Sequence, residues 1–224
     1  MKVQLLRKQN NSLTFMSNYI LFDPPDIERF YPFTLTRPLC EMRVFGGTIK
    51  QYWEQLLGKN ISYLTYPHLS SLYPAKWTND NTLIPSHILP IDFDKQKKIL
   101  FSINSSSKCS LRDIHRQYAK SNLSSEIYQL TSLLSFFDLL DKRDVFTFSK
   151  GKKINCNQSV FLNDDDGPIM IEDNVCIMEG AMIRGPVYIS EGSTIKMGAK
   201  IYGPTVIGPY CKIGGEVSKS IFLG

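Results

Sequence analysis

The sequence of 224 residues has no apolar run long enough to cross a membrane, where about 18 consecutive apolar residues are needed. Its first 23 residues, MKVQLLRKQNNSLTFMSNYILFD, are partly basic but contain no sustained apolar stretch, so they do not form a signal peptide. We therefore expect a cytoplasmic protein without a membrane partner. Residues 1–18 are interpreted as an N-terminal extension, with Met16 as an alternative start.

Cysteine is scarce and basic residues are not clustered. The five cysteines, at 40, 109, 156, 176 and 211, form no CxxC pair. An odd number at these spacings indicates neither a zinc site nor a disulfide framework, which favours reduced thiols. The net charge of +5 is spread along the chain without a basic run, and nucleic acid is therefore not expected as a partner.

Isoleucine, in contrast, recurs at every sixth position over a long stretch. The residue four places after each one is small or β-branched, and glycine, proline and polar residues cluster between them. The eight isoleucines in register are Ile171, Ile177, Ile183, Ile189, Ile195, Ile201, Ile207 and Ile213. Neither the helical period of 3.6 nor the strand period of 2 marks every sixth residue. A hexapeptide repeat is typical of a parallel β-helix.

Three hexads make one triangular coil in such a β-helix, so residues 18 positions apart should stack. Each short strand would place one isoleucine in a narrow interior, and glycine and proline would form the corners. The spacing predicts that Ile195 lies between Ile177 and Ile213. The six-residue spacing would place the next isoleucine at position 219, which is a lysine, so the repeat is expected to end there, after eight hexads or two and two-thirds coils. The alternative, an ordinary β-sandwich, is disfavoured by eight positions in one register.

The region before the hexads has mixed helix and strand patterns. Strands are expected at 18–23 and 60–66, with a helix between them that follows a glycine pair and ends near Gly58. Strand, loop, helix and strand form one α/β unit. Two further helices are expected, at 110–121 and, as the longest of the chain, at 124–143. The interpretation is an α/β domain at 19–158 and a β-helix at 159–224.

Three arginines, Arg29, Arg37 and Arg43, lie in the long loop between the first strand and the first helix. Loops at the carboxyl ends of parallel strands are where such folds bind ligands. Guanidinium groups suit phosphates, because they present paired donors in a fixed plane. Their alternative role is that of solvated or ion-paired surface residues.

Three segments carry a resemblance to a known family: LFDPPDIERFYPFTLTRP, GPIMIEDNVCIMEGAMIRGP and KMGAKIYGPTVIGPYCKIGGEVSKSIFLG. They resemble the bifunctional UDP-N-acetylglucosamine pyrophosphorylase / glucosamine-1-phosphate acetyltransferase family, in the alternative form found in Bacteroidetes. The resemblance implies a nucleotidyltransferase-like α/β domain followed by a left-handed parallel β-helix, assembled as a homotrimer. It implies a nucleoside triphosphate and a sugar 1-phosphate as substrates, Mg²⁺ as cofactor, and a role in nucleotide-sugar biosynthesis.

The resemblance also assigns roles to residues of the long loop. Arg37 would lie beside the transferring phosphate as the catalytic residue, and Asp23 is the candidate ligand of Mg²⁺. The residues expected to bind substrate are Arg29, Thr34, Arg43, Gly46 and Gly47. The sequence departs from the family at 23–26, where DPPD replaces the glycine-rich phosphate loop, and proline has no backbone N–H to offer a phosphate.

A second departure concerns acetyl transfer, for which the family uses a histidine in later coils. The histidines here, His68, His87 and His115, all precede the hexads, and we expect a chain truncated at Gly224. Two alternatives to nucleotidyl transfer therefore stay open. One is a hexapeptide acyltransferase that binds acetyl-CoA when the later coils are present; the cations expected at the coenzyme phosphates are Arg184, Lys196, Lys200 and Lys212. The other is a degenerate, non-catalytic module with an oligomerising β-helix.

Overall fold

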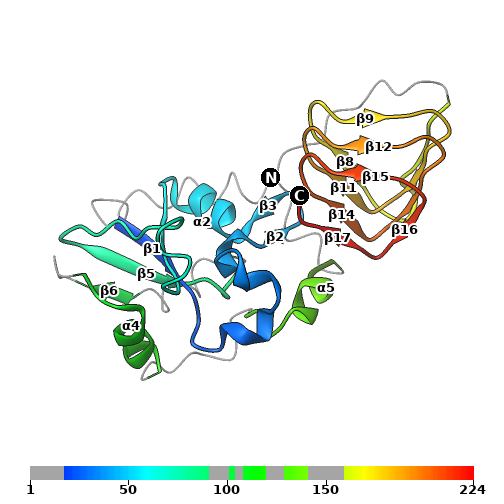
Figure 1. The fold of residues 1–224 in the computed structure, drawn as a ribbon. Helices are drawn as coiled ribbons and strands as arrows, with labels where there is room; N and C mark the ends of the chain where they lie inside the picture. Colours follow the sequence, from blue (N-terminus) through cyan, green and yellow to red (C-terminus); the bar gives the residue numbers. More distant parts are fainter. Residues whose placement is uncertain (1–17, 91–100, 104–107, 120–128, 141–158) are drawn as a thin grey trace. The chain divides into compact units, whose positions relative to one another are not determined.

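The computed structural model describes residues 18–90, 101–103, 108–119, 129–140 and 159–224. The chain divides into two compact units (Figure 1), one made of Met1–Glu41 and Ile49–Leu130, the other of Met42–Thr48 and Thr131–Gly224. The expected extension at 1–18 and the end of the expected α/β domain fall largely on residues outside the described segments. In the described segments, no helix has the length and apolarity needed to span a bilayer.

A four-stranded sheet forms the centre of the first unit. Its strands are β1 (Asn18–Phe22), β4 (Ser62–Leu64), β5 (Asn81–Pro85) and β6 (Phe101–Ile103), in the order β4-β1-β5-β6. β4 and β5 both run parallel to β1, while β6 is antiparallel to β5. The strands expected at 18–23 and 60–66 are confirmed, and they are nearest neighbours in the sheet.

Two helices of this unit follow the sequence patterns. α2 (Ile49–Leu57) buries Ile49, Tyr52, Trp53 and Leu57, and it ends at Gly58, whose φ of +67° suits glycine. In α4 (Leu111–Tyr118) the hydroxyl of Ser110 caps the first turn by accepting from the backbone N–H of Asp113. Ile114 and Tyr118 of α4 pack against Ile20, Phe22 and Leu83 of the sheet.

Three short 3₁₀ helices follow β1: Ile27–Phe30, Phe33–Leu35 and Leu39–Glu41. Prolines recur in this stretch, and a residue without an N–H cannot continue a longer helix, so only single turns form. The chain then makes an antiparallel hairpin of β2 (Arg43–Val44) and β3 (Gly47–Thr48) before it enters α2. The hairpin belongs to the second unit, although the segments on both sides of it belong to the first.

The long helix expected at 124–143 is wrong over part of its length. Gln129 forms an antiparallel bridge with Ile88, and the helix that exists, α5, covers only Leu134–Leu140. Residues 120–128 lie outside the described segments. Within α5, Leu134 is 71% exposed, whereas Phe136, Leu139 and Leu140 are buried. Pairing with Ile88 commits the chain to an extended path where helix propensity alone favours a helix.

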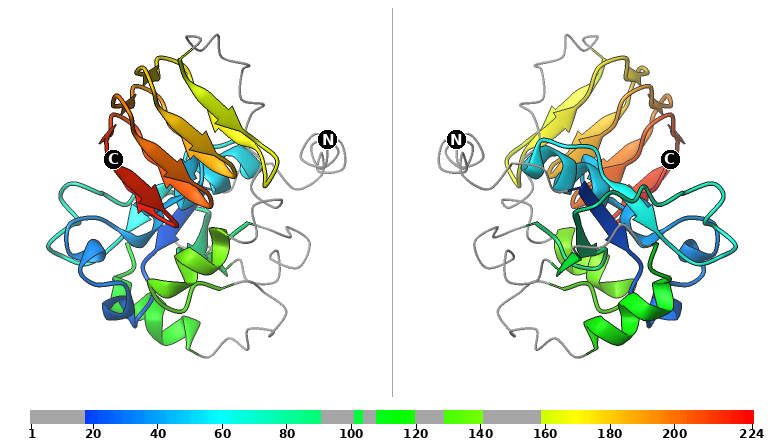
Figure 2. Two further views of the ribbon diagram at one scale, coloured as in Figure 1. Left: turned by 90° about the vertical axis from the view of Figure 1, so that its right-hand side faces the viewer. Right: turned by 90° about the vertical axis from the view of Figure 1, so that its left-hand side faces the viewer.

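Residues 159–224 of the second unit form a parallel β-solenoid of about three coils, built from three sheets (Figures 1 and 2). The first sheet contains β7 (Phe161–Asn163), β10 (Met182–Arg184), β13 (Lys200–Tyr202) and β16 (Glu216–Ser218). The second contains β8 (Ile169–Ile171), β11 (Val187–Ile189), β14 (Thr205–Ile207) and β17 (Ile221–Phe222). The third contains β9 (Cys176–Ile177), β12 (Thr194–Ile195) and β15 (Lys212–Ile213).

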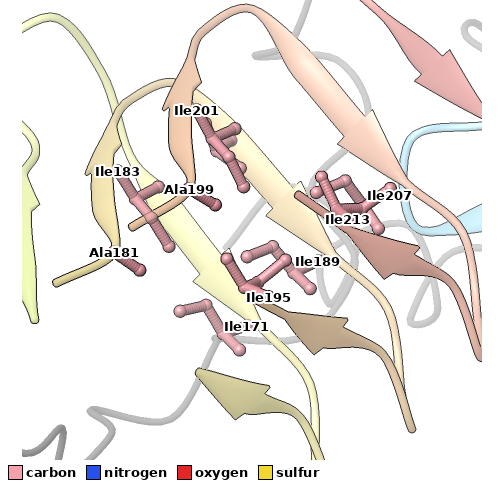
Figure 3. Packing of buried hydrophobic residues seen from close by; sticks show 10 residues of the cluster. Ile171, Ala181, Ile183, Ile189, Ile195, Ala199, Ile201, Ile207 and Ile213 are labelled. Atoms are coloured by element: carbon pink, nitrogen blue, oxygen red, sulfur yellow. The ribbon is translucent and has the colours of Figure 1, made fainter. Parts of the chain in front are cut away.

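The predicted stacking of residues 18 positions apart is confirmed. Ile195 pairs in register with Ile177 and Ile213, and Ile189 pairs with Ile171 and Ile207. Seven of the eight isoleucines are buried, and Ile177 is partly buried (Figure 3). The side chains of Ala181 and Ala199 are fully buried between them, because only small residues fit the space beside each corner. The left-handed winding stays a prediction of the resemblance.

The coils at the two ends depart from the hexapeptide spacing. Ile183 pairs with Leu162, 21 residues earlier, because the first coil contains the additional turn residues Asp164–Asp166. At the other end, the repeat was expected to end at Lys219, but the 18-residue stacking already shortens before it. Val217 pairs with Ile201, which lies only 16 residues earlier. The chain takes a shorter corner through Gly214 and Gly215, where Gly215 has a φ of +78°. Lys219, with a φ of +44°, lies in a second shortened corner.

Candidate functional site

The carboxyl ends of three neighbouring parallel strands meet at Asp23. Asp23 directly follows β1, Thr65 follows β4, and Ser86 follows β5. Oδ2 of Asp23 accepts a hydrogen bond of 2.6 Å from the hydroxyl of Thr65, and Oδ1 accepts one of 3.2 Å from Ser86. The carboxyl ends of the strands of an open α/β sheet are where ligands bind in such folds, so this edge is the candidate site.

Asp23 also closes the loop that carries two of the predicted arginines. The backbone N–H of Leu39 donates to Oδ1 of Asp23 over 2.9 Å. Asp23 is 2% exposed, and this burial raises the pKa of its carboxyl above the ordinary value, against the hydrogen bonds from Thr65, Leu39 and Ser86 that favour the charged form. Both oxygens are directed at protein donors, so Asp23 as it stands orders the loop.

Two histidines and a tyrosine surround this edge of the sheet. Nε2 of His115, on α4, lies 2.7 Å from the backbone carbonyl oxygen of Asp23. His87 follows Ser86, is 8% exposed, and its Nε2 lies 3.1 Å from the hydroxyl of Tyr118. Burial lowers the pKa of His87 to about 4, so its ring is neutral at pH 7. Its Nδ1 is buried without a hydrogen-bond partner among the described residues.

The sequence interpretation did not place His87, His115 or Tyr118 in a site. His87 could have been found, because it stands two residues after an apolar strand, at the edge where ligands bind. His115 and Tyr118 lie on a helix distant in sequence, and only the packing of that helix on the sheet brings them to Asp23 and His87.

The loop residues predicted to bind substrate have unequal surroundings. Arg29 is exposed and pairs with Asp26 at 3.2 Å. Arg37 is half-buried, and among the described residues its side chain makes no ion pair or hydrogen bond. Thr34 is buried, and its hydroxyl donates to the backbone carbonyl of Ile27 over 3.3 Å. Arg37 is therefore the loop arginine whose donors are not already engaged within its own unit.

The remaining predicted substrate residues, Arg43, Gly46 and Gly47, lie on the β2–β3 hairpin. One guanidinium nitrogen of Arg43 donates to the backbone carbonyl of Gly46 over 3.1 Å. Gly46 contacts Tyr188 so closely that a Cβ atom there would lie 2.3 Å from the tyrosine hydroxyl. The predicted set is thus divided, with Asp23, Arg29, Thr34 and Arg37 in the first unit and the hairpin residues in the second.

The four cations expected at coenzyme A phosphates are not gathered at one place on the solenoid. Arg184 and Lys200 lie on the first sheet, where Arg184 is ion-paired with Asp166. Lys212 lies on the third sheet, and Lys196 follows β12 at a corner, where its side chain lies beside Gly214. All four are exposed. Their distribution over two sheets does not form a single phosphate cluster.

Residues 19–104 match a family model described as sugar nucleotidyl transferase. The matched stretch contains the four-stranded sheet, Asp23, the three arginines and His87, whereas α4 lies beyond it. No curated protein matches the chain. The chain therefore carries a sugar nucleotidyltransferase-like domain in its N-terminal half, followed by a parallel β-solenoid.

Proposed function

We propose that this protein transfers a nucleotidyl group from a nucleoside triphosphate to a sugar 1-phosphate. The observation that carries the proposal is the family match at 19–104, whose centre is a parallel sheet with a polar, loop-covered carboxyl edge. An oxygen of the sugar phosphate attacks the α-phosphorus and forms a new P–O bond. The bond from the α-phosphorus to the bridging oxygen breaks, and pyrophosphate leaves with that electron pair.

Catalysis of phosphoryl-type transfer consists mostly of positioning and charge neutralisation. Arg37 is assigned to the transferring phosphate, because its half-buried guanidinium has no partner among the described residues. Arg29 is assigned to an outer phosphate, with Thr34 of the same loop lining the substrate. Arg43, Gly46 and Gly47 belong to the second unit, and their roles at the outer phosphates and the substrate rest on the resemblance alone. Arg29 would exchange its exposed ion pair with Asp26 for a phosphate, and such a pair is worth only about 0–1 kcal/mol.

Mg²⁺ stays a proposal that rests on the resemblance. Asp23 does not fit a metal ligand as it stands, because its oxygens accept hydrogen bonds from Leu39, Thr65 and Ser86 and it is 2% exposed. Among the described residues, no group of three or more His, Cys, Asp or Glu side chains could hold an ion. We therefore assign no step of the reaction to the metal.

The proposal has three more specific parts: UDP-N-acetylglucosamine as the product, a cytoplasmic location and a homotrimeric assembly. Trimerisation is supported by analogy with β-helix acyltransferases and by the apolar side chains on the outside of the solenoid, such as Phe161 at 61% and Met197 at 71% exposure. Light scattering at micromolar protein concentration should give three times the mass of the chain. A monomer contradicts the trimer and leaves nucleotidyl transfer intact.

The acyltransferase alternative is not better supported, because the four cations proposed for coenzyme A are spread over two sheets. Thermal unfolding in the presence of each ligand distinguishes nucleotidyl transfer, acyl transfer and a non-catalytic module. Under nucleotidyl transfer, a nucleoside triphosphate with Mg²⁺ raises the melting temperature of the transition reported by tryptophan fluorescence, and acetyl-CoA does not. A rise with acetyl-CoA alone supports the acyltransferase, and no rise with either supports a non-catalytic module.

A further inference from the structure

Three hydrogen-bond donors from separate segments of the first unit converge on one carboxylate. The backbone N–H of Leu39 and the hydroxyl of Ser86 donate to Oδ1 of Asp23 over 2.9 and 3.2 Å, and the hydroxyl of Thr65 donates to Oδ2 over 2.6 Å. Thr65 is 5% exposed, and Leu39 and Ser86 have no exposed surface, so the donors and the carboxylate are enclosed in the protein. Donors that point together into an enclosed space are the usual means by which proteins hold an anionic ligand.

The two hydroxyl donors are fixed by the hydrogen bonds of the sheet. The backbone N–H of Asp23 donates to the carbonyl of Leu64 over 3.1 Å, and that of Ser86 donates to the carbonyl of Phe22 over 2.9 Å. These bonds continue the parallel pairing of β1 with β4 and β5 by one residue, which places Thr65 and Ser86 on the two sides of Asp23. The donors should therefore keep their positions when the carboxylate alone is removed.

The segment that follows β1 has no N–H group left for the phosphate of a ligand. Pro24 and Pro25 have none, and the N–H of Asp23 is engaged by Leu64. The carbonyl oxygens of Pro24 and Pro25 accept from the hydroxyl of Tyr66 over 3.2 and 3.3 Å. A phosphate at this point would meet a carboxylate and carbonyl oxygens in place of donors.

Arg37 lies on the same loop, close in sequence to one of the three donors. The bond from the N–H of Leu39 to Asp23 fixes the chain two residues after Arg37. The guanidinium of Arg37 takes no part in that bond and has no ion pair or hydrogen bond among the described residues. The carboxylate of Asp23 thus holds this part of the loop and leaves the donors of Arg37 for a ligand.

We propose that the carboxylate of Asp23 is an internal ligand. It fills a carboxylate site formed by Leu39, Thr65 and Ser86, at the edge of the sheet where α/β folds receive the phosphate of a ligand. By filling this site, it confines the phosphates of a nucleotide to the Arg37 side of the loop. The confinement rests on the proposed nucleotidyl transfer, whereas the carboxylate site does not.

The first experiment empties the carboxylate site and offers it a free carboxylate. Asp23→Ala removes the internal ligand, and formate is the smallest carboxylate that can replace it. Thermal unfolding is followed by tryptophan fluorescence, which reports the first unit, with sodium chloride at equal concentration as the salt reference. Ile84→Ala is the matched control, because Ile84 has no exposed surface and its loss destabilises the same sheet while Asp23 stays in place.

We expect formate at about ten times its Kd to raise the melting temperature of Asp23→Ala by about 5 °C relative to chloride. The parent and Ile84→Ala should show no such rise. Adding Thr65→Val to Asp23→Ala removes one donor and should reduce the effect of formate. If Asp23→Ala is unfolded after purification, the readout is the recovery of native tryptophan fluorescence on dilution from urea, which should require formate.

The carboxylate site is overturned if formate stabilises Asp23→Ala no more than chloride does, or stabilises Ile84→Ala equally. In the refolding version of the experiment, equal recovery with formate and with chloride overturns it. A full effect of formate in the double variant with Thr65→Val removes Thr65 from the site and contradicts the three-donor arrangement.

The second experiment tests the confinement by titrating Asp23→Ala with a nucleoside triphosphate and Mg²⁺ at rising formate and constant ionic strength. The Kd of the nucleotide should not rise by more than about twofold, whereas competition for one site would raise it about tenfold when formate is at ten times its own Kd. A tenfold rise, or no nucleotide binding at any formate concentration, overturns the confinement. If the parent itself neither binds a nucleoside triphosphate nor releases pyrophosphate, nucleotidyl transfer fails with the confinement, and the formate shift still decides whether Asp23 fills a carboxylate site.

Discussion

The hydroxyl of Thr65 donates a 2.6 Å hydrogen bond to Oδ2 of Asp23, which ties the end of β4 to the end of β1. Ser86 makes the corresponding bond from the end of β5, and Leu39 adds a backbone N–H from 16 residues further along the chain. A single buried carboxylate therefore organises the edge of the sheet at which we place the substrate.

Replacing Asp23 by alanine should destabilise the first unit by about 3 kcal/mol, because buried donors on Leu39, Thr65 and Ser86 lose their acceptor. Both tryptophans of the chain, Trp53 and Trp77, lie in this unit, so urea unfolding followed by tryptophan fluorescence reports it. Thr36→Ala is the control, since Thr36 is exposed and its hydroxyl bond to Phe33 is local. An Asp23→Ala protein as stable as the parent contradicts the structural role of Asp23.

The raised pKa of Asp23 has a consequence for pH dependence. The folded state holds its proton more tightly than the unfolded state, whose carboxyl titrates near the ordinary aspartate pKa of 3.8. The stability from this group is thus full below that value and falls as the pH rises through the folded pKa. Asp23→Asn should remove this decline from the urea midpoints of the first unit. A decline of the same size in both proteins would assign it to another group.

His87 should produce the opposite slope. Its folded pKa of about 4 lies below the ordinary histidine pKa of 6.5, so between these two values the unfolded state binds a proton that the folded state does not. Stability is full above pH 6.5 and is lost as the pH falls toward 4, by an amount on the order of 3 kcal/mol. His87→Gln, which cannot be protonated, should flatten the profile between these values. His68→Gln is the exposed control and should not.

Replacing Ile195 by aspartate should prevent the solenoid from folding, because Ile195 has no exposed surface and an unpaired charge would lie in a narrow apolar interior. Ile195→Val should cost only about 0.5–1.5 kcal/mol. Thr194→Asp, on the outward and partly exposed neighbour, is the matched control. Far-UV circular dichroism and thermal unfolding provide the readout, and a normally folded Ile195→Asp protein contradicts the register.

The purified chain should not transfer acetyl groups to glucosamine 1-phosphate by itself. The attacking amine needs a base within hydrogen-bond reach, and residues 117–224 contain no histidine. The solenoid acids Asp173, Glu179, Glu191 and Glu216 are exposed, and Glu172 is occupied by Tyr188 and the backbone of Glu191. Release of free coenzyme A in proportion to enzyme, with acetylated product, contradicts this expectation.

The repeat made the solenoid predictable, because one steric requirement recurs at each corner and a single register satisfies it from Ile171 to Ile213. The 18-residue spacing does not hold at Asp164–Asp166 or after Ile213. There, extra or missing turn residues change the length of a coil, while the strands of successive coils still stack. The length of each turn depends on the local backbone geometry at positions such as Gly215. The periodicity of the isoleucines carries no information about that geometry.

The candidate site was less predictable from the sequence. Asp23 and the loop arginines are adjacent in the chain, and their position after an apolar strand identified them. His115 and Tyr118 depend on the packing of α4, and Tyr188 depends on a hairpin more than 140 residues earlier, so no local pattern indicates them. The sequence analysis interpreted Gly46 as a substrate-binding residue. In the structure, a side chain at position 46 would collide with Tyr188, so packing alone explains the glycine.

The most direct test of nucleotidyl transfer is pyrophosphate release by the 224-residue chain and by its Arg37→Ala variant, with Mg²⁺ and a panel of nucleoside triphosphates and sugar 1-phosphates. The proposed function predicts release with at least one pair, a loss of about 100-fold or more in Arg37→Ala, and unchanged circular dichroism and oligomeric mass in that variant. Absence of release with every pair, or full activity in Arg37→Ala, would contradict it.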